Sequence, residues 1–551
     1  LKKKNCKKAL VVVRLDLLRA DKKIFTRLTV DLLVKTAPKL SASAFWRTVI
    51  FCCNMASAAG RRLVCSQLSK LSKLTAPSQR ASLGPRRYAH AAAVPTSSSL
   101  PVQEQAQIRH ETSVPNPDPA PDSPTAAFLN QSVPYMVPTY VRPPPMMVQG
   151  DGCFLYDNEN RQYLDFTAGI AVNSLGHNDP ELNRLIAHQA QRLIHASNLY
   201  HNPWTPTLSK SLIEETQKQS PGSPLTQVFI SNSGSEANEA ALKFARKVTY
   251  AKDPNTKQRD IVSFHGSFHG RTYGSLSATP NKKYQPPFGP MLSGFRYGQY
   301  NDVAAVPELV NENTAGVIVE PIQGEGGINV ATPEFLQALR KRCDEVGAIL
   351  IFDEIQCGLS RTGDLWAHTA SGVHPDILTT AKALGNGIPI GATIVSGKTV
   401  APYINTGDHG TTFGGNPFAC RVAHHVFGRL AKTKLQEEVR RKSTLFFSFF
   451  DTINEKFPGI VSEVRGKGLI VGYQLSDSAK DKANEILTAA RERGLLIITA
   501  GDGVIRIVPP LVISDEEINR GLAILEDAFS AVFHKPGNVE GTAGQQEMAS
   551  R

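Results

Sequence analysis

Three short segments of the sequence carry residue types that could do chemistry, and each follows a run of apolar residues. A small-residue turn with Gly234 and Ser235 follows one run, Asp353 follows a second, and Lys382 follows a third. Glycine and serine at the start of a helix let backbone N–H groups and a hydroxyl approach a phosphate. A lysine in apolar surroundings has a lowered pKa and can form a Schiff base, and an aspartate can keep a pyridinium nitrogen protonated. Singly, Lys382 could be a surface lysine and Asp353 a helix cap, but the three in this order predict pyridoxal chemistry.

These residues could meet if the apolar runs are neighbouring strands. The runs 228–230, 317–319 and 348–352 are predicted to be buried strands, and helices are expected from Pro180 and from residues 332–334 to Gly347. Continuous apolar strands that alternate with helices are typical of a mostly parallel sheet covered on both faces. In such sheets ligands bind beyond the carboxyl ends of the strands. A capping box at residues 514–517 predicts a further helix near the end of the chain.

The charge of the chain is unevenly distributed. The 551 residues include 61 Lys and Arg against 49 Asp and Glu, a formal net charge of +12. That total divides into +17 over residues 1–100 and −5 over the remaining 451. A domain that holds nucleic acid needs cations across its folded face, so the acidic body disfavours that class.

The basic N-terminal region is typical of a targeting segment. Residues 55–88 are rich in Arg and Ser and lack acids, which predicts a mitochondrial transit peptide with a mature start near Ala89 and a matrix location. Because the first Met is Met55, residues 1–54 are expected to be upstream translation. The uncharged run 48–60 is too short for a membrane span, which needs roughly 20 residues.

The remaining composition suggests neither a metal site nor a disulfide framework, because none of the eight cysteines forms a CxxC pair. Residues 89–132 are rich in Pro and Ser and are expected to form an irregular linker, with the folded body beginning near Val133. The polar stretch 536–551 is expected to be a disordered tail. No period of 20–50 residues repeats, which argues against a solenoid.

Several long motifs in the body resemble one known family over roughly residues 134–535. They include NSGSEANEAALKFAR at 232–246, FHGRT at 268–272, VEPIQGEGGI at 319–328, FDEIQCGLSRTGDL at 352–365, TTAKALGNGIPIGA at 379–392 and HGTTFGGNP at 409–417. Together they resemble the class III aminotransferases of fold type I, which use pyridoxal 5′-phosphate. The resemblance implies an α/β fold with a large cofactor-binding domain over 173–430. A smaller α+β domain would be built from 133–172 and 431–535.

The resemblance also implies a role for each matching residue. Lys382 would form the Schiff base with the cofactor and carry the substrate proton, and Asp353 would pair with the ring nitrogen. The other implied cofactor contacts are Gln356 near the 3-oxygen, Phe268 stacked on the ring, Gly234 and Ser235 at the phosphate, and Thr412 from the partner subunit of a homodimer.

The resemblance assigns substrate binding to two arginines and a glutamate. Arg271 would grip a carboxylate, and Arg506, in an apolar strand, would need a partner, which in the family is the position of Glu325. Glu325 would neutralise Arg506 while the first substrate is bound, and the 2-oxoglutarate carboxylate would later displace it. Without such switching the pair would be a structural salt bridge. Thr411 is expected to contact substrate across the interface.

Within the class, the wording of the motifs favours the acetylornithine aminotransferase branch. The resemblance implies transfer of the δ-amino group of acetylornithine to 2-oxoglutarate in arginine biosynthesis. The ornithine and 4-aminobutyrate branches are alternatives. A non-catalytic scaffold is a further alternative, but it would be expected to have lost Lys382 or Asp353, and both are present.

Overall fold

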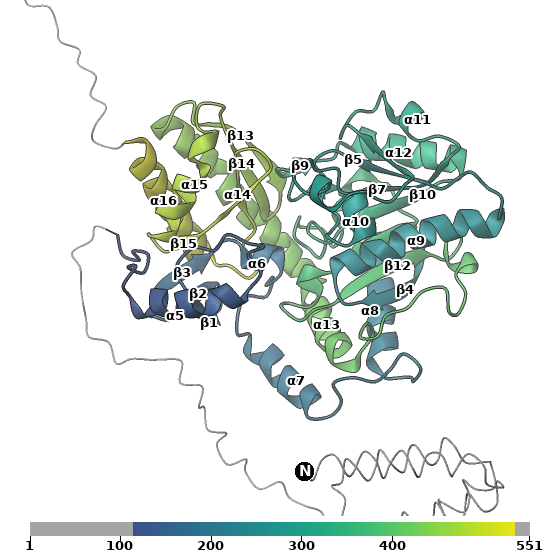
Figure 1. Cartoon of the computed structure of the whole chain (residues 1–551), viewed down its shortest axis with the longest axis horizontal. Coiled ribbons are helices and arrows are strands. Elements are labelled where there is room, and N and C mark those ends of the chain that lie inside the picture. The colour runs from purple at the N-terminus through teal and green to yellow at the C-terminus, as the bar shows by residue number, and fades with distance from the viewer. Residues whose placement is uncertain (1–113, 535–551) are drawn as a thin grey trace, which may run out of the picture. The chain divides into compact units, whose positions relative to one another are not determined.

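The computed structural model describes residues 114–534, shown in colour in Figure 1. The expected upstream segment 1–54, the leader 55–88, part of the linker and the tail 536–551 therefore lie outside the described residues. Within 114–534, no helix is both long and apolar enough to cross a membrane.

A seven-stranded sheet forms the centre of the described structure. Its order is β4-β12-β11-β10-β7-β5-β6, and β12 runs antiparallel to both of its neighbours while the other pairs are parallel. Every residue of β7, β10, β11 and β12 is buried. The predicted mostly parallel sheet is confirmed. The strands are β4 Leu225–Ser231, β5 Asp260–Phe264, β6 Phe295–Gly298, β7 Thr314–Val319, β10 Ile349–Asp353, β11 Ile377–Thr380 and β12 Gly391–Ser396.

Helices cover both faces of this sheet, as Figure 1 shows. Alternate strand residues divide between two cores: Ile318 and Ile351 pack with α9, while Val317 and Phe352 pack with α12. The period of two along each strand explains this division. The covering helices are α8 Trp204–Gln219, α9 Gly234–Lys252, α12 Pro333–Val346 and α13 Pro417–Leu430, with the short α10 Tyr273–Ser277 and α11 Val306–Leu309. Helix α7, Pro180–Ala190, packs against α13.

The predicted helix starts and stops agree with the local hydrogen bonds. The side chain of Asp179 caps α7, and that of Thr332 caps α12, which ends at Gly347 in the left-handed conformation. The capping box of Ser514 and Glu517 opens α16, Asp515–Phe533. Local signals therefore set these boundaries before any tertiary contact is considered.

Two four-stranded sheets lie outside the central one. The first has the order β1-β2-β3-β15 and joins the beginning of the described chain to its C-terminal part, because β15 pairs in parallel with β3. The second has the order β13-β14-β17-β16. The elements are β1 Met147–Asp151, β2 Phe154–Asp157, β3 Gln162–Asp165, β13 Val461–Lys467, β14 Ile470–Leu475, β15 Leu495–Leu496, β16 Ile498–Ala500 and β17 Val504–Ile507, with α6 Ala168–Ala171, α14 Thr433–Lys456 and α15 Ala483–Arg491, and the pair β8 Ile322–Gln323 and β9 Asn329–Val330.

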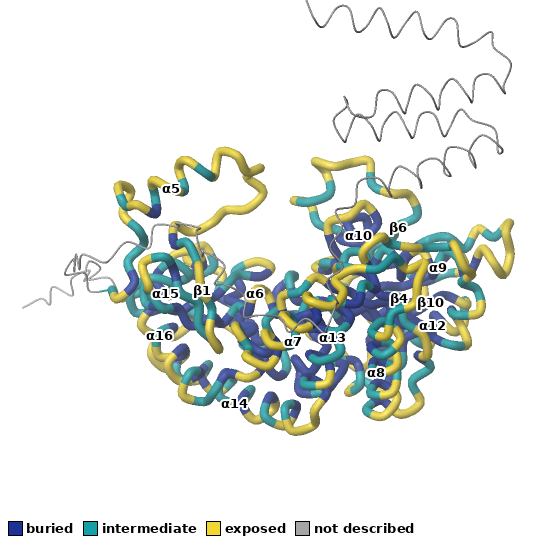
Figure 2. The backbone as a smooth tube through the Cα atoms, turned by 90° about the horizontal axis from the view of Figure 1, so that it is seen from below, coloured by how far each residue is buried: buried dark blue, intermediate teal, exposed yellow. Residues whose placement is uncertain are grey.

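The expectation of an irregular segment up to residue 132 is wrong. Helix α5, Pro124–Ser132, lies there, capped by Ser123 and with proline in its first turn, where the missing N–H costs nothing. Folded contacts also begin well before Val133. Asn116 is buried, and its side-chain amide donates to the Gln162 carbonyl. The Asp118 carboxylate accepts hydrogen bonds from Nε and Nη2 of Arg491. Much of the segment around α5 is nevertheless exposed (Figure 2).

A buried arginine ties the loop after β10 to the C-terminal strands. The Arg361 guanidinium donates to the carbonyls of Leu469 and Pro509 and to the Ser174 hydroxyl, and the Leu469 N–H donates back to the Arg361 carbonyl. In the described structure no carboxylate pairs with it, and burial lowers its pKa to about 9. Leu469 precedes β14 and Pro509 follows β17, so this arginine fixes both strands against the loop of Asp353.

Candidate active site

A cavity of about 290 Å³ lies beyond the carboxyl ends of the central strands. The loops after β4, β5, β7, β10 and β11 all contribute to its wall. This is where ligands bind in open α/β sheets. The lining includes six residues singled out from the sequence: Gly234, Ser235, Phe268, Asp353, Gln356 and Lys382.

Lys382 follows β11 and begins a short 3₁₀ turn, Lys382–Leu384. Its backbone has a φ of 39°, an unusual left-handed conformation for a lysine and one often found at functional sites. Lys382 is partly buried and lines the cavity. Burial, reinforced by the nearby Arg506, lowers the pKa of its amine to about 8. About a tenth of this amine is therefore neutral and nucleophilic at pH 7, far more than for a lysine of ordinary pKa.

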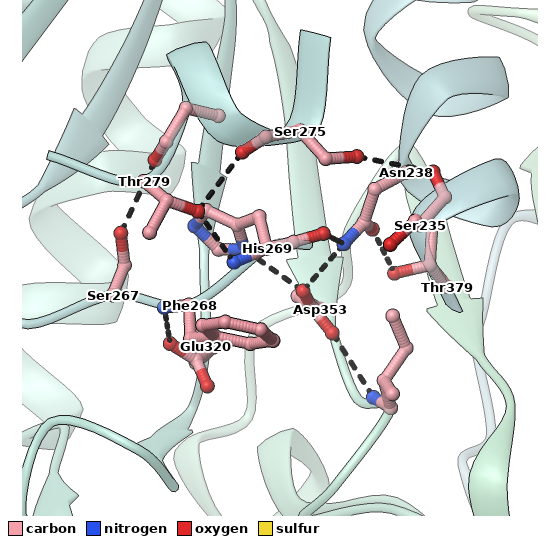
Figure 3. Close-up of polar contacts among 12 residues, drawn as sticks. Ser235, Asn238, Ser267, Phe268, His269, Ser275, Thr279, Glu320, Asp353 and Thr379 are labelled. Carbon is pink, nitrogen blue, oxygen red and sulfur yellow. Dashed lines mark hydrogen bonds and ion pairs between the residues drawn. The ribbon is translucent and has the colours of Figure 1, made fainter. Parts of the chain in front are cut away.

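The Asp353 carboxylate is buried at the end of β10 and is held by three donors. Its Oδ2 accepts from Asn238 Nδ2 at 2.7 Å and pairs with His269 Nδ1 at 2.8 Å, and its Oδ1 accepts from the N–H of Ile355. Thr379 Oγ1 in turn donates to Asn238 Oδ1. Figure 3 shows Asn238 and His269 both directed at this carboxylate. The donors satisfy a charge that would otherwise be too costly to bury.

The start of α9 supplies the small-residue turn predicted at this site. Ser233 caps the helix by accepting from the N–H of Glu236, so Gly234 and Ser235 stand at the helix N-terminus, where an anion is favoured, and both line the cavity. A Cβ at Gly234 would lie 2.8 Å from Cδ1 and 3.0 Å from Cγ2 of Ile355, so a larger residue would require the Ile355 side chain to move. Ser235 Oγ accepts from the N–H of Arg271, which links this turn to the loop after β5.

Two lining residues were not assigned roles from the sequence. His269 and Glu320 lie within the motifs FHGRT and VEPIQGEGGI, each just after a strand, and that position is the signal that could have found them. Glu320 accepts from the N–H groups of Phe268 and Gly324, and burial raises its pKa to about 7 against the opposing influence of His269. It therefore joins the Phe268 loop to the loop that carries Glu325.

The expected pair of Arg506 and Glu325 is present beside the cavity. Arg506 Nη2 lies 3.0 Å from Glu325 Oε2, and Nη1 donates to the Gly324 carbonyl and approaches Gln356. The Arg506 side chain is 3% exposed, whereas that of Glu325 is 37% exposed. The arginine is thus fixed in place while its carboxylate partner reaches the surface.

The remaining substrate residues lie outside the cavity wall. Arg271 is exposed, and none of the carboxylates in residues 114–534 forms an ion pair with it. Thr411 Oγ1 accepts from Asn232 Nδ2 of the same chain at 3.0 Å, and Thr412 is exposed. A contribution of Thr412 to another subunit is not tested by a single chain. No cluster of three or more His, Cys, Asp or Glu within the described range is arranged to hold a metal ion.

Comparisons with known proteins agree with this geometry. A family model described as aminotransferase class-III matches residues 135–529. The chain is 59% identical to the mitochondrial acetylornithine aminotransferase of Neurospora crassa, over 76% of this chain and 90% of the relative. It is 51% identical to the protein of the same name from Yarrowia lipolytica, over 73% and 96%.

Solved structures give the same result. The N-acetylornithine aminotransferase of Stenotrophomonas maltophilia is 37% identical, with a TM-score of 0.63 over 73% of this chain and 98% of that chain. The ornithine aminotransferase of Toxoplasma gondii, crystallised with partial occupancy of PLP at its active site, is 33% identical, with a TM-score of 0.69 over 74% and 94%. With a matching family model and relatives that share most of their length with it, this chain belongs to the class III aminotransferases.

Proposed function

We propose that this aminotransferase moves the δ-amino group of N2-acetylornithine to 2-oxoglutarate. The products would be N-acetylglutamate 5-semialdehyde and glutamate, in a ping-pong cycle within arginine biosynthesis. Curated relatives that are named acetylornithine aminotransferase, or probable acetylornithine aminotransferase, are 44–59% identical over 72–78% of this chain. The observation that carries the proposal is the buried Arg506 with its accessible partner Glu325, beside the cavity of Lys382.

The residues of the cavity fit pyridoxal 5′-phosphate, the cofactor implied by the family. The bound cofactor would supply an electron sink for the carbanion formed at the substrate carbon. Asp353 would pair with its ring nitrogen and hold that nitrogen protonated, because the carboxylate lines the cavity and its orientation is set by Asn238 and His269. The remaining contacts would be Gly234 and Ser235 at the phosphate, Phe268 on the ring face, Gln356 near the 3-oxygen and Thr412 of a second subunit.

Lys382 would bind the cofactor aldehyde through its amine and, once released, carry the proton at the substrate carbon. A base is most effective when its pKa lies near the working pH, and burial brings this amine to about 8. Glu320 and Asp353 lie close enough to interact with it electrostatically. The lysine thus sits in a polar but enclosed environment suited to repeated proton transfer.

The two arginines would let one site accept two unlike substrates. Acetylornithine carries its reacting amine far from its carboxylate, so Arg271 would hold that carboxylate while Glu325 neutralises Arg506. 2-Oxoglutarate has a carboxylate beside its reacting carbon, which would displace Glu325 and pair with Arg506. The partly exposed Glu325 side chain has room to leave.

The substrate assignment can be checked by mixing the purified holoenzyme separately with acetylornithine, ornithine and 4-aminobutyrate and following the absorbance of the bound cofactor. Acetylornithine is expected to convert the cofactor with a kcat/KM at least about tenfold above the other two amines, a difference of roughly 1.4 kcal/mol in transition-state binding. If ornithine or 4-aminobutyrate reacts fastest, the substrate assignment is wrong even though the class stands.

Replacing Glu325 by Gln should affect the two half-reactions unequally. Without its counter-charge, Arg506 would attract the acetylornithine carboxylate into the wrong place, so kcat/KM with acetylornithine should fall by about tenfold or more. The 2-oxoglutarate half-reaction should change by less than about threefold, since Glu325 is already displaced there. Single-turnover rates measure both.

Glu463→Gln is the matched control for this experiment, because that glutamate pairs with Arg465 on the surface of the same small sheet. It should leave both half-reactions unchanged. Equal losses in the two half-reactions of Glu325→Gln would identify the pair as a structural salt bridge without switching.

We also propose a homodimer that forms through an exposed apolar patch beside Thr412, made of Leu199, Tyr200 and Phe413. These three side chains are 87%, 71% and 63% exposed. Asn198 joins the two segments by donating to the carbonyls of Thr411 and Gly414. Contiguous exposed apolar surface of this kind is typical of subunit interfaces.

Phe413→Asp should weaken the dimer, because the new charge would have to be buried at the interface. Analytical ultracentrifugation should give a mass of two chains for the wild type and a concentration-dependent shift toward one chain for the variant. Val303→Asp, at an exposed valine away from the patch, is the control and should remain dimeric. A monomeric wild type would contradict the dimer.

The mitochondrial matrix is the proposed location, since curated relatives are named mitochondrial and residues 55–88 have the composition of a transit peptide.

We further propose that residues 133–172 and 431–535 form one smaller domain, which the pairing of β3 with β15 supports.

N-terminal sequencing of the protein isolated from mitochondria should find a start near Ala89. An intact start upstream of Met55 in that preparation would contradict the import proposal.

A further inference from the structure

Arg271 is held by aromatic rings. Its guanidinium carbon lies 3.8 Å from the ring centre of Tyr284 and 5.5 Å from that of Phe268. Within residues 114–534 it forms no ion pair with a carboxylate. A cation over the face of an aromatic ring is attracted by the negative potential of that face. The aromatic rings therefore orient the Arg271 guanidinium without placing a negative charge beside it.

The loop that presents Tyr284 is itself fixed. The N–H of Tyr284 donates to the Asn281 carbonyl in a tight turn. The side-chain amide of Gln285 donates to the carbonyls of Leu276 and Ser277 at the end of α10. The ring of Tyr284 is consequently anchored to the same helix that follows Arg271, and its place over the guanidinium is built into the local fold.

Tyr284 was not singled out from the sequence. It follows Lys282 and Lys283 in a loop, and a tyrosine in that setting carries no recognisable signal.

The two arginines have different kinds of partner: a carboxylate contacts Arg506, and an aromatic ring contacts Arg271. Arg506 is neutralised by Glu325, a partner that must leave before a carboxylate can bind. Arg271 would have to bind a carboxylate in both half-reactions, so a carboxylate partner would compete every time. An aromatic face leaves the N–H edges of the guanidinium open for bidentate binding.

We propose that Tyr284 is a positioning residue that holds Arg271 ready for substrate carboxylates through ring stacking and leaves its charge uncompensated. The inference deepens the proposed function and rests on the carboxylate-binding role of Arg271 given there. The class of ligand concerned is a dicarboxylate or an acylated amino acid with one free carboxylate. The ring, and not the hydroxyl, carries the effect.

The test uses Tyr284→Leu and Tyr284→Phe in the holoenzyme, with glutarate as an unreactive dicarboxylate whose dissociation constant is measured by calorimetry. Tyr284→Leu should weaken glutarate binding by about three- to fivefold, as expected for loss of a partly exposed cation–π contact. Tyr284→Phe keeps the ring and should remain within about twofold of wild type. The KM for 2-oxoglutarate should rise in Tyr284→Leu in the same proportion, with kcat little changed.

Tyr284→Leu is also made in the Arg271→Ala variant, to distinguish an effect through Arg271 from a general loss of structure. There, Tyr284→Leu should have no further effect on glutarate binding, because the two residues act as one unit. The inference is overturned if Tyr284→Phe binds glutarate as weakly as Tyr284→Leu, or if the losses from Tyr284→Leu and Arg271→Ala add. Unchanged glutarate binding in Arg271→Ala overturns both this inference and the proposed role of Arg271. No reaction of wild type with acetylornithine, while glutarate still binds through Arg271, overturns the substrate assignment alone.

Discussion

A charge that must stay buried organises the centre of this protein. The Asp353 carboxylate stands at the end of β10 with almost no exposed surface, and neighbouring donors take the place of water around its oxygens. Those donors come from α9 and from the loop after β5, so both must be correctly placed for the carboxylate to be tolerated. Because α9 also supplies the small-residue turn and the β5 loop also carries Phe268 and Arg271, satisfying one charge aligns most of the cavity.

The parts of the structure that depend on local patterns were predictable from the sequence. The buried strands, the caps at Asp179 and Thr332, and the capping box at Ser514 are all set within a few residues. The helix α5 was missed because the dense prolines were taken to exclude regular structure, whereas Pro124 occupies the first turn, where proline is favoured.

Long-range contacts explain what the sequence could not provide. Asn238 and Asp353 are 115 positions apart, and His269 and Asp353 are 84 apart, so no spacing rule connects them. Lys382 and Asp353 were found because each follows an apolar strand. Tyr284 was not found, since its importance depends on a guanidinium that folds onto its ring. Resemblance to the family named the residues of the expected chemistry, and the packing shows which others hold them.

The buried hydrogen bonds of Arg361 restrict the motion of the C-terminal strands relative to the central sheet. Its guanidinium serves two backbone carbonyls and a hydroxyl, all buried, and no carboxylate of the described structure shares its charge. If β14 and β17 moved away from the Asp353 loop, the buried Arg361 guanidinium and the carbonyls of Leu469 and Pro509 would lose their hydrogen-bond partners. This energetic cost opposes a hinge motion between the two strands and the loop. In the proposed mechanism, the site would then adapt to its two substrates by movement of the Glu325 side chain away from Arg506, while the surrounding strands stay in place.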